Sequence, residues 1–444
     1  MGVLSKIASK RSTLTTKNTD VTTAAQLTLR QSLWPLSIVT ILFFLWGLSY
    51  GLLDTLNKHF QNTLDITRTR SSGLQAAYFG AYPLASLGYA NWILRHWGYK
   101  SVFIFGLCVF GVGALMMWPA GVYRSFGGFC GATFICGSGL GSLETAANPY
   151  LSVCGPPRYS ELRINFAQAF NAIGTVIGPV LGSYVFFKNT GDSVAALKNV
   201  QWVYLGIAIF VFLLAFVFFM SHIPEVTDAD MEFQVQETHV GGSEKPFWKQ
   251  YRLFHAAFAQ FCYTGAQVAI ASYFINYAVD TRPGTSSATG AKLLAGAQGA
   301  FAFGRFSGTF LMKFVKPRYV FLAYLTGVVA FVGAASGARQ NAGIGGACVP
   351  SLLGKVADMH NDTGIAMVVP TAFMIAAETY ALAVNFVPAY RIPADMVGNS
   401  TIGIQTAQDT GDVEKSEATH VAQGVDGAEV VEIQKPDGGH AMIH

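Results

Sequence analysis

Residues 34–53 read WPLSIVTILFFLWGLSYGLL, and this stretch decides the fold class because it contains no charged side chain. An α-helix rises about 1.5 Å per residue, so about 20 apolar residues cross the roughly 30 Å hydrocarbon core of a bilayer. A transmembrane β-strand would instead alternate apolar and polar residues, and this stretch does not. It therefore predicts a membrane-spanning helix.

Further long apolar blocks follow along the chain. They lie at residues 74–94, 102–122, 126–154, 166–187, 202–220, 254–279, 293–312, 319–337 and 365–387. Only 12% of the 444 residues are charged, about half of the roughly 25% that an ordinary soluble domain carries. Block length and composition together predict an all-α polytopic membrane protein.

The hydrophilic stretch 221–250 separates six apolar blocks from four, and we expect it to be a cytosolic linker between two helical bundles. The expected parts are a polar tail, a first bundle, the linker, a second bundle and a disordered polar tail, at residues 1–32, 33–220, 221–250, 251–390 and 391–444. The first tail lacks the apolar region of a signal peptide. Lys and Arg are more numerous in the loops on the face of the membrane where the N-terminus lies than on the opposite face. This distribution places both termini in the cytosol.

The second group of blocks is shorter than the first. Residues 345–356 are apolar but too few to span a bilayer. Each group has a basic loop after its second block, at residues 94–100 and 304–318, which indicates a weak internal repeat. Repeated halves are typical of secondary transporters, whose substrate site lies between the halves, although any cytosolic loop tends to be basic.

Three acidic residues interrupt or end the apolar blocks: Asp54, Glu144 and Glu378. A charge in a bilayer core costs about 2.5–3.5 kcal/mol on insertion scales, so an acid there indicates function by default. A carboxyl group removed from water holds its proton more tightly, and it can bind a proton on one side and release it on the other. We expect this of Asp54 and Glu144, the alternative being a structural acid. The structural reading is favoured for Glu378.

Amide side chains recur close to Glu144 in the sequence. Asn148 follows by four residues and shares its helix face. Asn165, Gln168 and Asn171 repeat every three residues and are also expected to share a face. Amides offer donors and acceptors that suit sugar hydroxyls, while hydrogen bonds between helices are the alternative.

Two more polar sets are candidates for substrate binding. Gln75, Tyr78 and Tyr82 share a face in the second block, and Tyr263 and Gln267 share one in the seventh. Aromatic faces can stack on the apolar faces of sugars, although a tyrosine stripe is more often plain packing.

Several other patterns argue for close helix packing and against enzymes. Gly174, Gly178 and Gly182 are spaced by four, which lets helices approach closely. The glycines of residues 137–141 lack the following Lys-Ser/Thr of a phosphate loop. The cysteines show no metal-ligand spacing, no catalytic motif stands out, and a net charge of +4 suggests no nucleic-acid partner. We therefore expect a non-enzyme without cofactors that uses an energy source other than ATP.

Four motifs resemble the fucose permease family of the major facilitator superfamily. They are FFLWG at residues 43–47 together with Asp54, GLGSLETAANPY at 139–150, RINFAQAFN at 163–171 and YTGAQ at 263–267. The fourth-span motif is a specific one. The resemblance covers roughly residues 36–340 and 345–390.

The resemblance implies proton-coupled symport of fucose, galactose or glucose by alternating access between two six-helix bundles. Asp54 and Glu144 would be the protonatable or substrate-binding acids, and Gln168 and Asn171 would be cavity amides. The family has twelve spans, whereas this chain shows ten and a fragment. The missing part falls near residues 343–345, so the cavity would lack a wall.

The expected partners are a monosaccharide, a proton and the lipid bilayer. We expect a monomer in the plasma membrane. The alternatives are a sugar sensor that does not transport and an inactive, shortened form.

Overall fold

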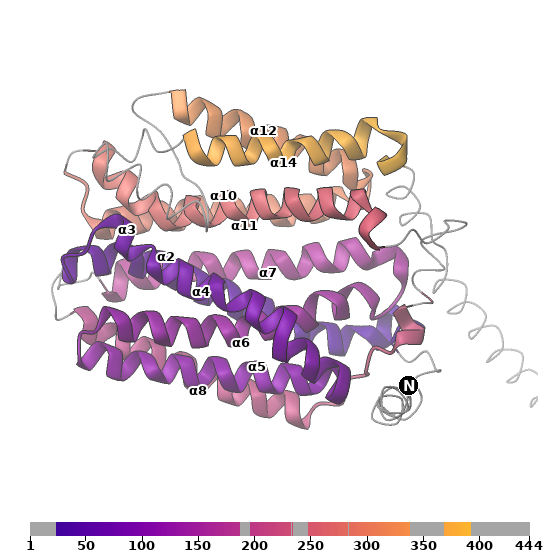
Figure 1. The fold of residues 1–444 in the computed structure, drawn as a ribbon, viewed down its shortest axis with the longest axis horizontal. Coiled ribbons are helices and arrows are strands. Elements are labelled where there is room, and N and C mark those ends of the chain that lie inside the picture. Colours follow the sequence, from indigo (N-terminus) through magenta and orange to yellow (C-terminus); the bar gives the residue numbers. More distant parts are fainter. Residues whose placement is uncertain are drawn as a thin grey trace, which may run out of the picture.

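The computed structural model describes residues 24–186, 196–231, 233, 247–282, 284–337 and 368–391. All elements in these ranges are helices, and most of them are long and run side by side (Figure 1). The all-α fold is therefore confirmed. The apolar fragment 345–356, the joint near 343–345 and most of both polar tails lie outside the described residues.

The first bundle is formed by the helices before residue 221. Its long helices are α2 (Leu29–Thr63), α4 (Gly73–Pro83), α5 (Ala90–Val122), α6 (Phe126–Val153), α7 (Ser160–Leu181) and α8 (Ala196–Met220). Short elements connect or extend them: α3 (Arg68–Ser71), η1 (Leu84–Tyr89), η2 (Pro157–Tyr159) and η3 (Gly182–Phe186). In Figure 1, α5, α6 and α8 form the lower part of the molecule and α7 lies nearer its middle.

The second bundle is smaller. It consists of the short η4 (Phe247–Lys249) and of α10 (Tyr251–Thr281), α11 (Ser287–Leu311), α12 (Pro317–Gly337) and α14 (Val368–Phe386). In Figure 1, α12 and α14 form the upper edge, and α10 and α11 lie between them and α7. The two bundles meet along α7 and α11, and also where α2 contacts α10.

Six helical segments among the described residues are long and apolar enough to cross a membrane: residues 29–63, 68–122, 126–153, 160–185, 198–220 and 369–386. The segment 68–122 holds two of the predicted spans, because the chain turns at Gly98, where φ is +84°. Glycine adopts this left-handed conformation without the steric cost that other residues meet. With α10, α11 and α12, the described helices account for the ten predicted spans.

The second span departs from helical geometry at Gly88, one to two turns after Pro83. Pro83 has no amide hydrogen and its ring crowds the preceding turn, and the π-helical turn η1 follows it directly. Gly88 in this turn has φ −100° and ψ −116°, far from helical values. The departure therefore has a local cause in the sequence.

Glycines let the backbones of α2 and α7 touch. A Cβ added to Gly47 would lie 1.9 Å from the carbonyl oxygen of Asn171, and one added to Gly178 would lie 2.2 Å from the carbonyl carbon of Gly51. Even alanine at these positions would push the helices apart. The predicted packing role is confirmed for all three glycines spaced by four: Gly174, Gly178 and Gly182.

The C-terminal end of α6 is capped by Arg163. Its guanidinium donates hydrogen bonds to the carbonyl oxygens of Leu151 at 2.9 Å, Ser152 at 2.9 Å and Pro156 at 2.7 Å. The last carbonyls of a helix have no partner within the helix. Arg163 supplies one from α7 and so fixes α7 to α6.

The segment after α8 binds the same end of the first bundle. The Glu225 carboxylate accepts hydrogen bonds from the backbone amides of Tyr99, at 2.7 Å, and Lys100, at 3.2 Å. The buried Asp230 carboxylate accepts from the amides of Ala24 and Ala25 at 3.2 and 3.0 Å. The first residues of the linker region therefore pack on the bundle.

Candidate functional site

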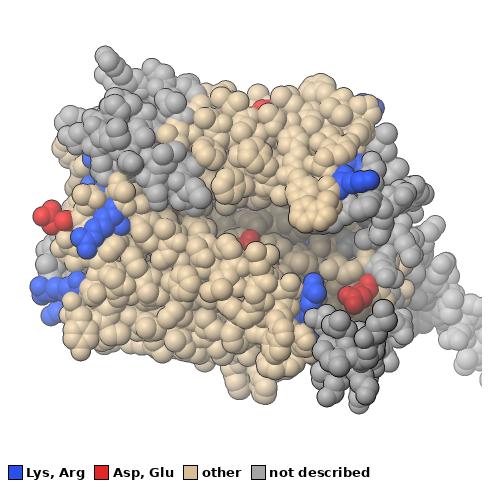
Figure 2. Space-filling model, in the orientation of Figure 1, with Lys and Arg blue, Asp and Glu red and all other residues tan. Residues whose placement is uncertain are grey.

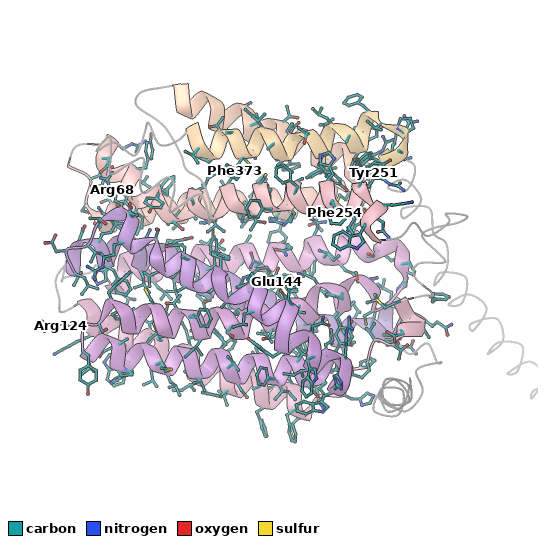
Figure 3. All side chains as sticks on the ribbon, viewed as in Figure 1. Arg68, Arg124, Glu144, Tyr251, Phe254 and Phe373 are labelled. Carbon is teal, nitrogen blue, oxygen red and sulfur yellow. The ribbon has the colours of Figure 1, made fainter. Side chains whose placement is uncertain are left out.

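The surface is hollowed between the upper and lower halves of the molecule, and an acidic side chain lies at the floor of the hollow (Figure 2). Figure 3, in the same orientation, labels Glu144 in the middle of the molecule. A small pocket surrounds this residue. It is lined by residues of α2 and α6: Leu42, Phe43, Trp46, Leu140, Leu143, Glu144 and Ala147.

Glu144 and Asn148 form a polar pair in this apolar setting. The Asn148 amide nitrogen donates to a carboxylate oxygen of Glu144 at 3.2 Å, and both side chains are half-buried. The predicted shared face is therefore confirmed. Together the pair offers an amide and two kinds of oxygen, which can both donate to and accept from a hydroxylated ligand.

Aromatic side chains of α4 and α2 adjoin the polar pair. The hydroxyls of Tyr78 and Tyr82 lie 3.5 Å apart, and both groups lie within electrostatic reach of Glu144. The Trp46 indole interacts with the Tyr82 hydroxyl. Gln75 is fully buried, and neither polar atom of its amide forms a hydrogen bond within the described part of the chain.

The amides of α7 do not share one face, which corrects the sequence interpretation. The Asn165 amide donates to the Glu161 carbonyl at 2.9 Å and lies 3.8 Å from the sulfur of Met312, the residue that caps the C-terminal end of α11. The Asn171 amide donates instead to the Phe43 carbonyl of α2 at 3.2 Å. Each step of three residues falls about 60° short of a full turn, so the stripe winds around the helix.

These contacts favour the alternative of hydrogen bonds between helices for Asn171. Gln168, between the two, is half-buried. Its role as a cavity amide stays a prediction.

The candidates of the second bundle lie on α10. Tyr263 packs beside the buried cluster that α10 forms with α12 and α14, and it lies within electrostatic reach of Tyr50 on α2. Gln267, one turn later, is half-buried. Asn276 is fully buried, and its amide makes no hydrogen bond among the described residues.

Asp54 lies apart from the Glu144 pocket, at the contact between α2 and α10. Its side chain is fully buried, and the Ser272 hydroxyl donates to one carboxyl oxygen at 2.7 Å. The other carboxyl oxygen has no hydrogen-bond partner within the described residues. The two predicted acids thus occupy two different environments.

Glu378 has a polar neighbour that the sequence does not reveal. The Thr326 hydroxyl of α12 donates to a Glu378 carboxyl oxygen at 2.6 Å. This bond joins α12 to α14 across the outer part of the second bundle, and it is consistent with a structural acid.

Several residues near the two acids are missed by reasoning from sequence. Ser272 and Asn57 contact each other across the bundles, and Thr175 donates to Gln298 of α11 at 3.2 Å. A single serine or threonine in an apolar block carries no sequence signal. Trp46 lies within the FFLWG motif, and this motif is the sequence signal that could have identified it as a pocket residue.

At the far end of the α2–α10 contact, a surface ion pair joins the bundles. Arg68 lies 3.0 Å from the Asp280 carboxylate, and the Tyr273 hydroxyl donates to the Arg68 carbonyl at 3.0 Å. Asn62 and Ser287 are in contact nearby at 3.5 Å. Figure 3 shows Arg68 at the left end of the molecule, away from Tyr251 at the other end of α10.

Comparisons with known proteins point to one family. The family model described as Major Facilitator Superfamily matches residues 38–392. The chain is 31% identical to the L-fucose-proton symporter of Escherichia coli over 66% of this chain and 71% of that protein. It is also 31% identical to the glucose/galactose transporter of Brucella abortus, over 68% and 73% of the two chains.

Solved structures agree with this family. The structure of the E. coli fucose:proton symporter FucP matches with a TM-score of 0.58 at 25% identity, over 79% of this chain and 98% of that one. A D-xylose-proton symporter matches with a TM-score of 0.53 at 13% identity over 82% of this chain and 94% of that one, a likeness of fold alone.

Proposed function

Since this chain belongs to the Major Facilitator Superfamily, we propose that it is a secondary transporter that carries a hexose together with a proton across a membrane. The observation that carries the proposal is the Glu144–Asn148 pair, whose glutamate lies in the middle of the molecule (Figure 3) and lines a small pocket. Membrane transporters place polar groups where their two halves meet. The names of the similar proteins, fucose-proton symporter and glucose/galactose transporter, support a sugar as the substrate.

In the proposed site, the polar pair binds sugar hydroxyls. The Glu144 carboxylate is an acceptor and the Asn148 amide is both donor and acceptor. The Trp46 and Tyr82 rings supply apolar faces beside them. Fucose, galactose and glucose each combine hydroxyls with an apolar ring face, and we propose the substrate from among these three.

Asp54 is the proposed second component, which binds the proton. A carboxylate is expensive to bury without full hydrogen bonding, whereas the neutral acid is much cheaper to bury. Proton binding would therefore allow the α2–α10 contact to close over Asp54. Release of the proton requires water to reach this residue, which links the proton to movement of the bundles.

The central test is uptake into proteoliposomes under an inward proton gradient, with labelled fucose, galactose and glucose. The wild-type protein should accumulate one of the three sugars. Glu144→Gln should abolish accumulation because it removes the carboxylate from the pocket. The matched control is Glu378→Gln, which also neutralises an acid within an apolar block but bonds to Thr326 between α12 and α14 and does not line the Glu144 pocket, and it should retain uptake.

Unchanged accumulation by Glu144→Gln would refute its role. If the wild-type protein binds sugar, measured by tryptophan fluorescence, but never accumulates it, the protein is a sensor. A wild-type protein that shows neither sugar binding nor uptake is an inactive, shortened form.

Asp54→Asn should separate exchange from accumulation. Asparagine resembles the protonated acid in shape and charge but cannot release a proton. We expect this variant to exchange labelled for unlabelled sugar across vesicles and to lose gradient-driven accumulation. Loss of both activities in a folded variant would instead make Asp54 essential for binding or movement.

A further inference from the structure

Two side chains of α2 hold a single residue of α10. The Ser272 hydroxyl donates to Asp54 at 2.7 Å, and the Asn57 amide donates to the backbone carbonyl of Ser272 at 2.9 Å. All three residues are fully buried. Asp54 and Asn57 are three positions apart and therefore lie on one face of α2, so this face binds both the side chain and the backbone of Ser272.

The Ser272 hydroxyl has two acceptors for one hydrogen. Besides Asp54, the carbonyl oxygen of Val268 on its own helix lies 2.8 Å away. When Asp54 is ionised, the hydroxyl donates to the carboxylate. When Asp54 is protonated, the acid can donate to the serine oxygen while the serine hydrogen turns to Val268. A hydroxyl can make this exchange because it is both donor and acceptor.

Among the described residues, no other side chain forms a hydrogen bond with the Asp54 carboxyl group. Asp54 forms no ion pair there, and its second oxygen makes no hydrogen bond. Tyr50, one turn earlier on α2, lies within electrostatic reach of Asp54, and its hydroxyl has no hydrogen-bond partner in the described part of the chain. Tyr78 and Tyr263 lie in turn within electrostatic reach of Tyr50, and the buried Lys58 and His59 follow Asp54 by about one turn on α2.

The position of the contact matters for transport. On α10, Ser272 directly precedes Tyr273, whose hydroxyl bonds to the carbonyl of Arg68 in α3, and Asp280, which pairs with Arg68, follows about two turns later. Opening this end of the molecule must therefore separate Ser272 from Asp54 and Asn57. The acid at this buried contact, Asp54, is the group proposed to carry the proton.

We propose that Ser272 is a positioning residue that couples the proton on Asp54 to closure of the two bundles at the Arg68 end of the molecule. Its hydroxyl can bond to Asp54 in either protonation state, with the direction of the hydrogen bond reversed, but only the neutral acid is cheap to bury, so protonation of Asp54 favours the closed contact. This inference rests on the proposed proton coupling.

The test measures how often this end opens. Ala271 is buried where α10 meets Tyr50 of α2, so Ala271→Cys provides a small probe there. Its rate of labelling by a membrane-impermeant thiol reagent, added from the Arg68 side of proteoliposomes, reports opening. The same protein without the added cysteine corrects for the native thiols.

Adding Ser272→Ala should raise the labelling rate about fivefold, the change expected when one buried hydrogen bond is lost from the closed form. Ser272→Thr keeps the hydroxyl and should restore slow labelling. The matched control is Thr309→Ala, which removes a buried hydroxyl of α11 that bonds to its own helix at 2.8 Å, and it should label slowly. An unchanged rate in Ser272→Ala, or an equal rise in all three variants, overturns the proposal.

Two further measurements separate positioning from general loosening. In an Asp54→Ala background, Ser272→Ala should add little to the labelling rate, because the partner is gone; a full additional rise would contradict the coupling. In transport, Ser272→Ala should reduce accumulation more than exchange. Labelling needs neither sugar nor a gradient, so it tests the contact even if the wild-type protein transports nothing and the proposed function fails.

Discussion

Single charged residues hold the end of the first bundle together, and Arg163 does so through three backbone carbonyls. Arg163→Ala leaves these buried carbonyls without a donor, at a cost of about 3 kcal/mol. We expect the melting temperature in detergent, followed by tryptophan fluorescence, to fall by several degrees. The melting temperature of Arg163→Lys should lie between those of the wild type and Arg163→Ala, because a lysine cannot reproduce the forked hydrogen bonds of the guanidinium. A Lys variant as stable as the wild type would show that charge alone suffices.

Glu225, outside the membrane-spanning segments, should make stability depend on pH. Burial raises the pKa of its carboxyl above the usual glutamate value, although the hydrogen bonds from Tyr99 and Lys100 act in the opposite direction. The folded protein thus holds this proton more tightly than the unfolded chain. Its stabilising contribution is present below about pH 4.3 and is lost as the pH rises through the raised pKa.

Glu225→Gln removes this titration and provides the comparison. Relative to this variant, the wild type should melt at a progressively lower temperature as the pH rises from about 4.5. A constant difference between the two melting temperatures over the window up to neutral pH would contradict the prediction.

At the residue scale, sequence reasoning identifies charged groups better than neutral ones. Glu144 and Asp54 stand out because a charge in an apolar block is rare. Their surroundings could not be predicted, because Asp54 meets Ser272 more than two hundred positions away in the sequence. A lone serine among apolar residues has the same sequence signature whether it binds an acid or its own helix.

At the scale of helices, the glycine contacts between α2 and α7 are the strictest requirement in the first bundle. Gly47→Ala would place a methyl group 1.9 Å from the Asn171 carbonyl oxygen. The helices must separate, at a cost of about 1–3 kcal/mol, and we expect a lower melting temperature and weaker uptake. Gly80→Ala is the matched control because an added Cβ there meets nothing within 4 Å. Equal effects of the two substitutions would contradict the packing argument.

Helix positions were predictable from block lengths, but helix faces were only partly so. The spacing of four between Glu144 and Asn148 predicts their contact, because it nearly completes a turn. In α7, each step of three residues turns the side-chain direction about 60° less than a full turn. Over two steps, Asn165 and Asn171 come to contact different neighbouring helices. Which neighbour each face meets depends on tertiary packing, which periodicity does not encode.

At the scale of the whole molecule, closure at the Arg68 end should be reversible during transport. Asn62→Cys and Ser287→Cys would place thiols on α2 and α11 where the native side chains are 3.5 Å apart. A short bis-methanethiosulfonate, which forms a disulfide with each cysteine and releases methanesulfinate, should cross-link them and stop uptake, and reduction of the disulfides should restore it. The control is each single cysteine variant treated with the same reagent. Continued uptake by the cross-linked protein would show that this end need not open.

The overall architecture followed from the sequence more completely than the site did. The ten apolar blocks each correspond to helical residues, because span length is dictated by the bilayer. The arrangement of the bundles and the hollow between them could not be derived from composition, and came only from the family resemblance.

The glycine contacts also have a mechanical consequence. The backbones of α2 and α7 touch. The 35-residue α2 therefore cannot separate from α7 by itself and must move with its bundle as a rigid body. The long contact between α7 and α11 is then the axis about which this rigid bundle rotates. A movement at Asp54, the proposed proton site, is then passed along α2 to Trp46 in the proposed sugar pocket.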